Sequence, residues 1–294
     1  MASPVAADPR TKYPAPPLPE HDQPAPGSDA AMAVKADHGE ESYHGSGKLT
    51  GRAALITGAD SGIGRAVALA YAREGADVLI SYLNEHEDAR ETARLVEEAG
   101  RRAVLVPGDI SVETHCQELV RRAVAEFGRL DILVNNAAYQ MPHEDIVDIT
   151  AEELQHTYAT NIFAMFYLVK AALPHLPPGS AIVNTCSVQA YQPTPELLAY
   201  ATTKGAIVTF TKGLAKMLAK EGIRVNVVAP GPIWTPLIPS TLGAEEASRF
   251  GEQTPLGRPG QPAELAGVYV LLASESSSYT TGMVYGVTGG MLLG

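Results

Sequence analysis

The sequence predicts an α/β fold with a doubly wound parallel sheet of seven strands and helices on both faces. From Gly51 onward, short apolar runs alternate with amphipathic stretches, a pattern typical of consecutive βαβ units. The runs are also nearly continuous in apolar residues, as strands that are covered by helices on both faces require. We therefore expect one α/β domain over residues 49–294, preceded by an extension over residues 1–48.

Seven apolar runs are the expected strands, and most intervals between them leave room for a helix. The runs are AALIT (53–57), DVLIS (77–81), AVLVPG (103–108), LDILVNN (130–136), SAIVNT (180–185), RVNVVAP (224–230) and GMVYGV (282–287). The chain has 294 residues, and a domain of roughly 245 residues with an added extension fits this length.

The extension differs in composition from the rest of the chain. Residues 1–48 hold 8 of the 22 prolines and few large apolar residues, so they cannot bury enough surface to fold alone. Two interpretations stay open: a disordered tail, or an arm that docks on the body or on a neighbouring subunit. The docking residues of such an arm would be Tyr13, Pro16, Pro17 and Tyr43.

The composition excludes several classes of protein. A formal charge of -11 with scattered basic residues argues against a nucleic-acid partner. No apolar stretch reaches the ~18 residues of a membrane span, and the N-terminus does not resemble a secretory signal, so we expect no membrane partner and a cytoplasmic location. Only Cys116 and Cys186 are present, and neither cysteines nor histidines have zinc-site spacing, so no metal is expected.

A glycine-rich turn follows the first expected strand. Residues 57–64 read Thr-Gly-Ala-Asp-Ser-Gly-Ile-Gly and lead into a helical run. Glycines at 58, 62 and 64 would let the backbone approach a pyrophosphate closely, while the following helix directs its N–H groups at it. The spacing is G-x-x-x-G-x-G and not the commoner G-x-G-x-x-G. A Rossmann-type dinucleotide site is thus predicted.

The sequence leaves the choice between NAD and NADP open. Tyr82 stands where an NAD-specific protein should place an acid at the end of the second strand, and no Arg or Lys occurs in 59–61 or 82–88 to hold a 2′-phosphate. Asp60 would repel such a phosphate. Arg65 could bind it only if its side chain turned back from the helix.

Three further residues form a candidate catalytic set. Tyr200 and Lys204 are four apart on an expected helix and so project from one face. Ser187 lies 13 positions before Tyr200 at the end of an expected strand, where the carboxyl ends of parallel strands open onto a ligand crevice. We therefore expect a hydroxyl and a Tyr–Lys pair to meet in that crevice.

With these motifs in order, the chain resembles the classical short-chain dehydrogenase/reductase (SDR) family over about residues 49–294. The matches are TGxxxGIG (57–64), Asp109, the NNAx run (135–138), Asn161, Ser187, Tyr200-x-x-x-Lys204 and Pro230-Gly231. The extension and the runs DHGEESY (37–43) and VQAYQPTPELLAY (188–200) look like the subgroup of general-stress and aldehyde-reductase-like oxidoreductases. The family usually has Gly where this chain has Ala138, which we expect only to repack the turn.

The resemblance implies an NAD(P)-dependent oxidoreductase that acts on a small carbonyl or alcohol. Tyr200 would be the general acid or base, and Lys204 would lower its pKa and bind the nicotinamide ribose. Ser187 would hold the substrate oxygen, and Asn161 would steady a relay water. The implied cofactor-binding residues are Gly58, Asp60, Ser61, Gly62, Ile63, Gly64, Tyr82, Asp109, Ile110, Asn136, Ala137, Ala138, Tyr200, Lys204, Pro230, Gly231, Ile233 and Thr235.

The substrate pocket is expected to be apolar or neutral. Its candidate walls are Gln140, Met141, Gln189, Tyr191 and Trp234, and they include no Arg or Lys to bind a phosphate or carboxylate. Cys186 is interpreted as an apolar filler and not as a nucleophile, because no base is placed for it.

Two other functions remain possible on the sequence. One is a catalytically silent dinucleotide-binding redox sensor or scaffold, although the intact catalytic set argues against it. The other is a methyltransferase-type nucleotide fold, which would not need the Tyr–Lys pair. Helix faces in 152–173 and 196–219 carry more apolar residues than one core face needs, so we also expect a homotetramer.

Overall fold

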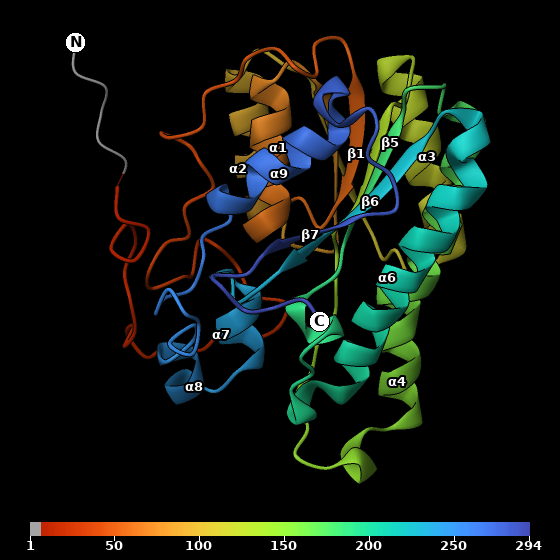
Figure 1. Ribbon diagram of the computed structural model, residues 1–294. Coiled ribbons are helices and arrows are strands. Elements are labelled where there is room, and N and C mark those ends of the chain that lie inside the picture. The colour runs from red at the N-terminus through yellow and green to blue at the C-terminus, as the bar shows by residue number, and fades with distance from the viewer. Residues whose placement is uncertain (1–6) are drawn as a thin grey trace, which may run out of the picture.

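Seven parallel strands form the centre of the protein, whose computed structural model describes residues 7–294 (Figure 1). The strands are β1 (Ala53–Thr57), β2 (Asp77–Tyr82), β3 (Ala103–Pro107), β4 (Ile132–Asn135), β5 (Ala181–Thr185), β6 (Arg224–Pro230) and β7 (Val284–Val287). Their order is β3-β2-β1-β4-β5-β6-β7. This arrangement confirms the predicted doubly wound sheet, and each strand lies within two residues of its expected run.

Burial differs between the central and the outer strands. Every residue of β1, β2, β4 and β5 is buried, as their apolar sequences predict. The edge strands β3 and β7 are only half-buried. These two strands are therefore less buried than expected, because each lies at an edge of the sheet with a neighbouring strand on one side only.

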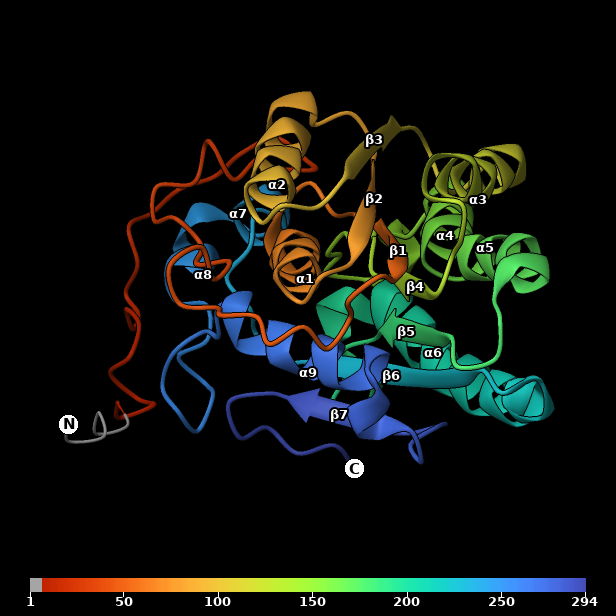
Figure 2. The same cartoon turned by 90° about the horizontal axis from the view of Figure 1, so that it is seen from above.

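Helices cover both faces of the sheet (Figure 2). The helices are α1 (Gly62–Arg73), α2 (His86–Glu98), α3 (Glu113–Phe127), α4 (Ala151–Tyr158), α5 (Ala164–Ala172), α6 (Leu198–Leu218), α7 (Leu237–Thr241), α8 (Ala244–Ser248) and α9 (Ala263–Ala273). One face carries α1, α2 and α9, and the other carries α3, α5 and α6. A π-helical turn over Ala159–Phe163 joins α4 to α5. No helix in the part of the chain that the structure describes is long and apolar enough to cross a membrane.

The two faces of the sheet are buried in separate apolar cores. Ile56 and Ile80 point to the side of α1 and α9, whereas Leu55 and Leu79 point to the side of α3 and α5. This alternation follows from the period of two in a strand. The carboxyl ends of the strands are thereby fixed between two packed layers.

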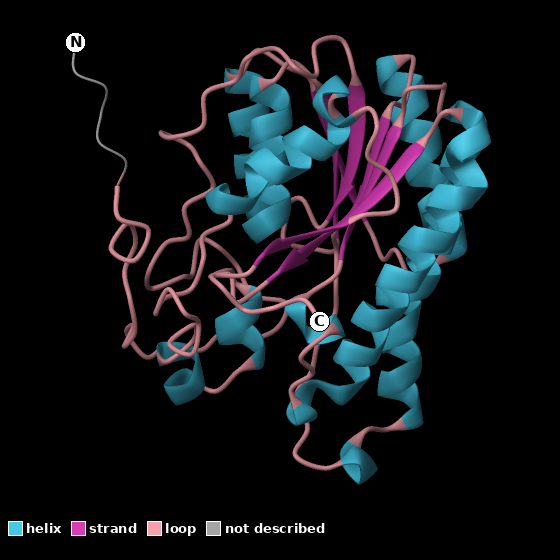
Figure 3. Cartoon of the chain, in the orientation of Figure 1, coloured by secondary structure: helices cyan, strands magenta, loops and turns pink. Residues whose placement is uncertain are grey.

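Residues 7–48 form an arm that runs along the outside of the body as turns and loops (Figure 3). The Tyr43 hydroxyl donates to Glu74 Oε1 over 2.7 Å, and Arg73 donates to the backbone carbonyl oxygens of Gly39 and Tyr43. The Tyr13 hydroxyl donates to Asp37 within the arm. The described arm thus lies against the body, while residues 1–6 of the expected extension lie outside the described residues.

Candidate active site

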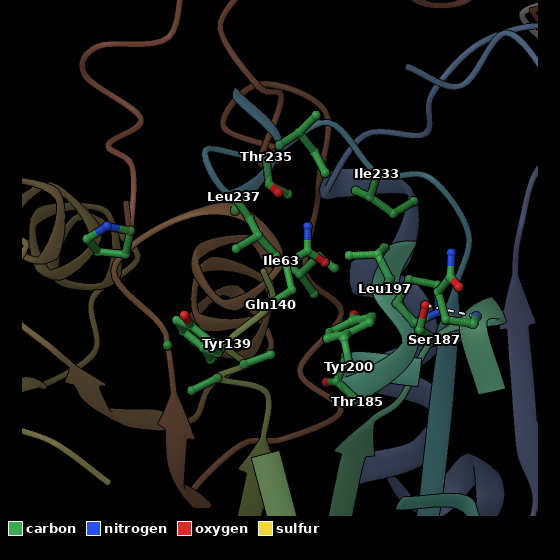
Figure 4. A pocket seen from close by; sticks show the side chains of 18 of the residues that line it. Ile63, Tyr139, Gln140, Thr185, Ser187, Leu197, Tyr200, Ile233, Thr235 and Leu237 are labelled. Carbon is green, nitrogen blue, oxygen red and sulfur yellow. Dashed lines mark hydrogen bonds between the residues drawn. The ribbon is translucent and has the colours of Figure 1, made fainter. Parts of the chain in front are cut away.

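A cavity of about 910 Å³ opens at the carboxyl ends of the strands (Figure 4). The strand order reverses between β1 and β4, since β2 and β3 lie on one side of β1 and the later strands on the other. Such a switch point leaves a crevice between the loops that leave in opposite directions. Both the glycine turn and Tyr200 line this cavity, which we call the cleft.

The glycine turn has the shape of a cradle for a pyrophosphate. A Cβ atom on Gly64 would lie 1.9 Å from the carbonyl oxygen of Gly58, so the turn and α1 touch backbone to backbone. Gly62 has a φ of +49°, and a Cβ there would lie 3.0 Å from Thr235 Cγ2. Gly58 and Gly62 line the cleft without side chains, whereas Gly64 is not among the described residues that line it. A dinucleotide backbone could therefore approach the turn at Gly58 and Gly62, and the residues present fit that group.

The Arg65 side chain turns back from α1, as binding of a 2′-phosphate would require, but it is bonded to the protein itself. Its guanidinium donates to the backbone oxygens of Asp60 and Asp88 and to Thr92. The side chain is buried. Arg65 therefore fixes the glycine turn and does not line the cleft in the described structure.

Tyr200, Lys204 and Ser187 all line the cleft, as expected. Figure 4 shows Tyr200 and Ser187 in it. Lys204 Nζ lies 5.0 Å from the centre of the Tyr200 ring and donates to the Thr185 carbonyl oxygen over 3.2 Å. Ser187 Oγ accepts from the backbone N–H of Gln189 over 3.1 Å, which orients the hydroxyl. All three residues are buried at the cleft wall.

Burial governs the protonation of this pair. It raises the pKa of the Tyr200 phenol well above its ordinary value, and the Ser187 hydroxyl only partly offsets this rise. Burial also lowers the pKa of Lys204 to about 8. The expected lowering of the Tyr200 pKa by Lys204 is thus not found in the protein alone, because desolvation of the phenolate dominates and the hydrogen bond with Ser187 is what opposes it.

The Asn161 side chain is bonded to the loop at Tyr139 and to α6. Its amide oxygen accepts from Tyr139 N over 2.8 Å, and its amide nitrogen donates to Tyr139 O and Thr203 Oγ1. The side chain is fully buried within the π-helical turn and is not among the described residues that line the cleft. The Asn161 side chain therefore braces the loop at Tyr139, and the role of Asn161 at a relay water stays a prediction.

Sequence reasoning missed a network that links β1, β4 and β5 behind the cleft. Thr57 Oγ1 accepts from the backbone N–H groups of Asn136 and Ala137, and the Asn136 amide donates to the Thr57 and Gly58 carbonyls. Thr185 Oγ1 in turn bonds the Tyr269 hydroxyl over 2.6 Å. The only sequence signal was that Thr57 and Thr185 end their strands.

Most expected site residues line the cleft. They are Gly58, Asp60, Ser61, Gly62, Ile63, Tyr82, Asp109, Ile110, Asn136, Ala137, Ala138, Gln140, Gln189, Pro230, Gly231, Ile233 and Thr235, in addition to the catalytic set. Burial raises the pKa of the Cys186 thiol to about 11, which fits a filler and not a nucleophile.

Three expected pocket walls are corrected by the structure. Met141, Tyr191 and Trp234 are not among the described residues that line the cleft. Tyr191 packs beside Cys186 and Ile207 in an apolar cluster. The Trp234 ring is 1% exposed, and its Nε1 donates to the backbone oxygen of Val34 in the arm, so it faces away from the cleft.

The fold and the cleft together define an oxidoreductase that uses a dinucleotide. The sequence matches the family described as enoyl-(acyl carrier protein) reductase over residues 58–292. It is 54% identical to the uncharacterized oxidoreductase YghA of Escherichia coli, with 98% of both chains covered. It is 45% identical to NADPH-dependent aldehyde reductase 1 of Arabidopsis thaliana, with 91% of this chain and 96% of the relative covered.

Solved structures of short chain dehydrogenases have the same fold as this chain. A short chain dehydrogenase from Burkholderia cenocepacia in complex with NADP matches with a TM-score of 0.78 and 32% identity, over 83% of this chain and 99% of that one. One from Mycobacterium paratuberculosis bound to NAD matches with a TM-score of 0.76 and 31% identity over the same shares. The chain belongs to the classical short-chain dehydrogenase/reductase family and is an NAD(P)-dependent oxidoreductase.

Proposed function

We propose that this protein reduces a small, uncharged aldehyde or ketone to the alcohol. The observation that carries this proposal is geometric: the Tyr200 phenol lies at the wall of the dinucleotide cleft beside the Ser187 hydroxyl, and Lys204 Nζ lies 5.0 Å from the centre of its ring. A phenol that stays protonated at neutral pH can donate a proton, which is the role that reduction of a carbonyl needs.

The chain's own residues would handle the oxygen and its proton. Bound NAD(P)H supplies the hydride. The Ser187 hydroxyl would hold the carbonyl oxygen, and Tyr200 would give its proton to that oxygen as negative charge develops on it. The phenolate left behind would be stabilised by the nearby Lys204 ammonium, which is held by the Thr185 carbonyl and would also bind the nicotinamide ribose.

The charge of the cleft favours an uncharged substrate. Lys204 is the only lysine among the described lining residues, and no arginine is among them. Six acids line the cleft: Asp60, Glu85, Asp109, Glu144, Glu196 and Glu246. Phosphate or carboxylate groups on a substrate would be repelled by these acids. The name of the Arabidopsis relative, an aldehyde reductase, supports the same class of substrate.

The test is oxidation of NADH and NADPH, followed at the nicotinamide absorbance, with a panel of short aldehydes, ketones and their phosphorylated or carboxylated analogues. We expect turnover with the uncharged carbonyls and little with the charged ones. Dinucleotide binding without turnover of any carbonyl would instead favour the redox sensor or scaffold.

Asp60 is expected to make NADPH binding depend on pH. Burial raises the pKa of Asp60 to about 7, with Glu85 and Asp88 adding to the rise, and the residue lines the cleft near Tyr82, where the adenosine ribose is expected. As the pH rises through 7, the carboxyl gains a charge that repels a 2′-phosphate. NADPH affinity relative to NADH should fall by about tenfold, since like charges about 10 Å apart repel by ~1.7 kcal/mol at an effective dielectric constant of ~20.

Calorimetric dissociation constants for NADH and NADPH at pH 6 and pH 8.5 measure this effect. The 2′-phosphate titrates near pH ~6 itself, so the variant Asp60→Asn is the control that isolates the contribution of the carboxyl. If the ratio of NADPH affinity to NADH affinity changes equally with pH in the parent and in the variant, Asp60 does not face the 2′ position.

We also infer that the protein is a homotetramer. Helices α4, α5 and α6 and the turn between the first two expose Leu154, Phe163, Phe166, Leu198 and Met217. Apolar side chains gathered on adjacent helices are typical of surfaces buried between subunits. Sedimentation at micromolar concentration should give four times the chain mass of 31.0 kDa, and a monomer would contradict the inference.

A further inference from the structure

Residues 235–253, which we call the flap, form one wall of the cleft. The flap follows β6 and contains the two short helices α7 and α8, of five residues each. Helices of this length have little stability of their own, so their position depends on packing. The flap residues that line the cleft are Thr235, Pro236, Leu237, Ile238, Leu242, Glu246, Phe250 and Gln253.

The opposite side of the flap packs against the arm. Leu18 and Met32 of the arm form an apolar cluster with Trp234, Ile238 and Ala247, and all five are less than a tenth exposed. Val34, Ala36, Leu242 and Phe250 complete the cluster. Ile238, Leu242 and Phe250 therefore belong both to the cluster and to the lining of the cleft. The arm thus supports side chains that face the ligand.

Hydrogen bonds between backbones repeat this contact along the flap. Leu18 N donates to Ser248 O over 2.8 Å, and Gln23 N donates to Pro239 O over 2.8 Å. Ser240 Oγ donates to Pro26 O over 3.1 Å. These bonds need the arm in one register, so the arm holds both flap helices at once.

The arm also reaches the cleft and the glycine turn. Pro26 and Gly27 line the cleft, and a Cβ atom on Gly27, whose φ is +86°, would lie 2.5 Å from the carbonyl oxygen of Pro236. Two residues further on, Asp29 Oδ2 accepts from Gly62 N over 3.2 Å and pairs with Arg65. The arm consequently ties the flap to the turn that receives the pyrophosphate.

We propose that the arm is a positioning element of the dinucleotide site. The docked arm holds the flap in the conformation that binds NAD(P)H. The same conformation would bind the carbonyl substrate, and this second part rests on the proposed reductase function. Without docking of the arm, the flap would sample positions that cannot bind. If only about one-tenth of the molecules then keep a competent flap, the apparent dissociation constant rises about tenfold.

Substitutions in the full-length chain test this proposal. Gly27→Ala drives a methyl group into the Pro236 carbonyl and should lift the arm from the flap. Gly51→Ala is the matched control, because Gly51 also has a positive φ of +75° but has no described atom within 4 Å of its Cβ position. The double substitution Leu18→Ala and Met32→Ala weakens the cluster in a second way, without backbone strain, and decides the question if Gly27→Ala does not fold.

Two readouts do not depend on turnover. Trp234 is the only tryptophan and is buried between arm and flap, so its emission in the absence of dinucleotide reports whether the arm is docked. Calorimetry gives the dissociation constant for NADH. Steady-state KM and kcat with an accepted aldehyde form a third readout, since a positioning role should raise KM more than it lowers kcat.

We expect both arm variants to shift the Trp234 emission to longer wavelength and to weaken NADH binding about tenfold, with the control unchanged. A shifted emission with unchanged NADH affinity would overturn the proposal, because the arm would then be undocked without consequence. Unchanged emission and affinity in both variants would overturn it as well. If no carbonyl is turned over, NADH affinity still decides the role of the arm, and only the proposed reductase function fails.

Discussion

Replacing Tyr200 by Phe should lower turnover of any accepted carbonyl by about 10²–10⁴-fold, the range that a positioned general acid contributes. The substitution removes only the phenol oxygen and leaves the ring that Lys204 packs against. The dissociation constant for NADH should therefore change by less than about threefold. A tenfold change would correspond to ~1.4 kcal/mol of binding free energy. Oxidation of NADH at saturating aldehyde measures the first effect, and calorimetry measures the second.

Tyr71→Phe is the matched control for this experiment. Tyr71 is as buried as Tyr200 and its hydroxyl donates to the Tyr269 carbonyl oxygen, but it is not among the described residues that line the cleft. We expect it to lose about 1 kcal/mol of stability through the lost hydrogen bond and to keep its turnover. If Tyr200→Phe keeps more than about a tenth of parental turnover, its loss is smaller than the weakest effect expected of a general acid. Tyr200 is then not the proton donor.

Gly64→Ala should weaken dinucleotide binding about 100-fold. The new methyl group would lie 1.9 Å from the Gly58 carbonyl oxygen and 2.8 Å from Ala59 Cα, so it meets backbone atoms that cannot rotate away. The glycine turn must then open, which we expect to cost about 3 kcal/mol, the upper part of the range for overpacking, or about 100-fold in affinity for NADH. Calorimetric titration with NADH checks this prediction.

Gly213→Ala provides the comparison, because it makes the same substitution in the exposed side of α6 with no described atom within 4 Å of the new methyl group. Alanine there should stabilise the helix by about 1 kcal/mol and leave NADH affinity unchanged. If Gly64→Ala bound NADH as tightly as the parent, residues 57–64 would not be the pyrophosphate site.

The local patterns of the sequence were sufficient to predict the fold and to predict that the candidate catalytic set would meet in one crevice. Each strand carries its own apolar run, and the glycine turn, Ser187 and the Tyr200–Lys204 pair each end or begin an element. Parallel strands bring such ends to one edge of a sheet, so the crevice could be expected without coordinates.

Contacts between distant segments could not be predicted in the same way. The sequence left open whether the extension docks, and it assigned Trp234 to the pocket because Trp234 follows β6. The structure gives its indole a partner at Val34, 200 positions earlier in the chain. No periodicity links two such positions, since neither belongs to a repeating element.

The sequence by itself determined the α/β class, the order of the candidate catalytic residues and the lack of arginine around the expected pocket, because these depend on residue type and on spacing within single elements. The tertiary structure alone decided which groups are desolvated and which surfaces meet. Burial raises the pKa of the Tyr200 phenol and lowers the pKa of Lys204 to about 8. It is packing across the chain that makes the arm a neighbour of the cleft. Both effects depend on atoms brought close by folding, and their strength falls with distances that no local pattern encodes.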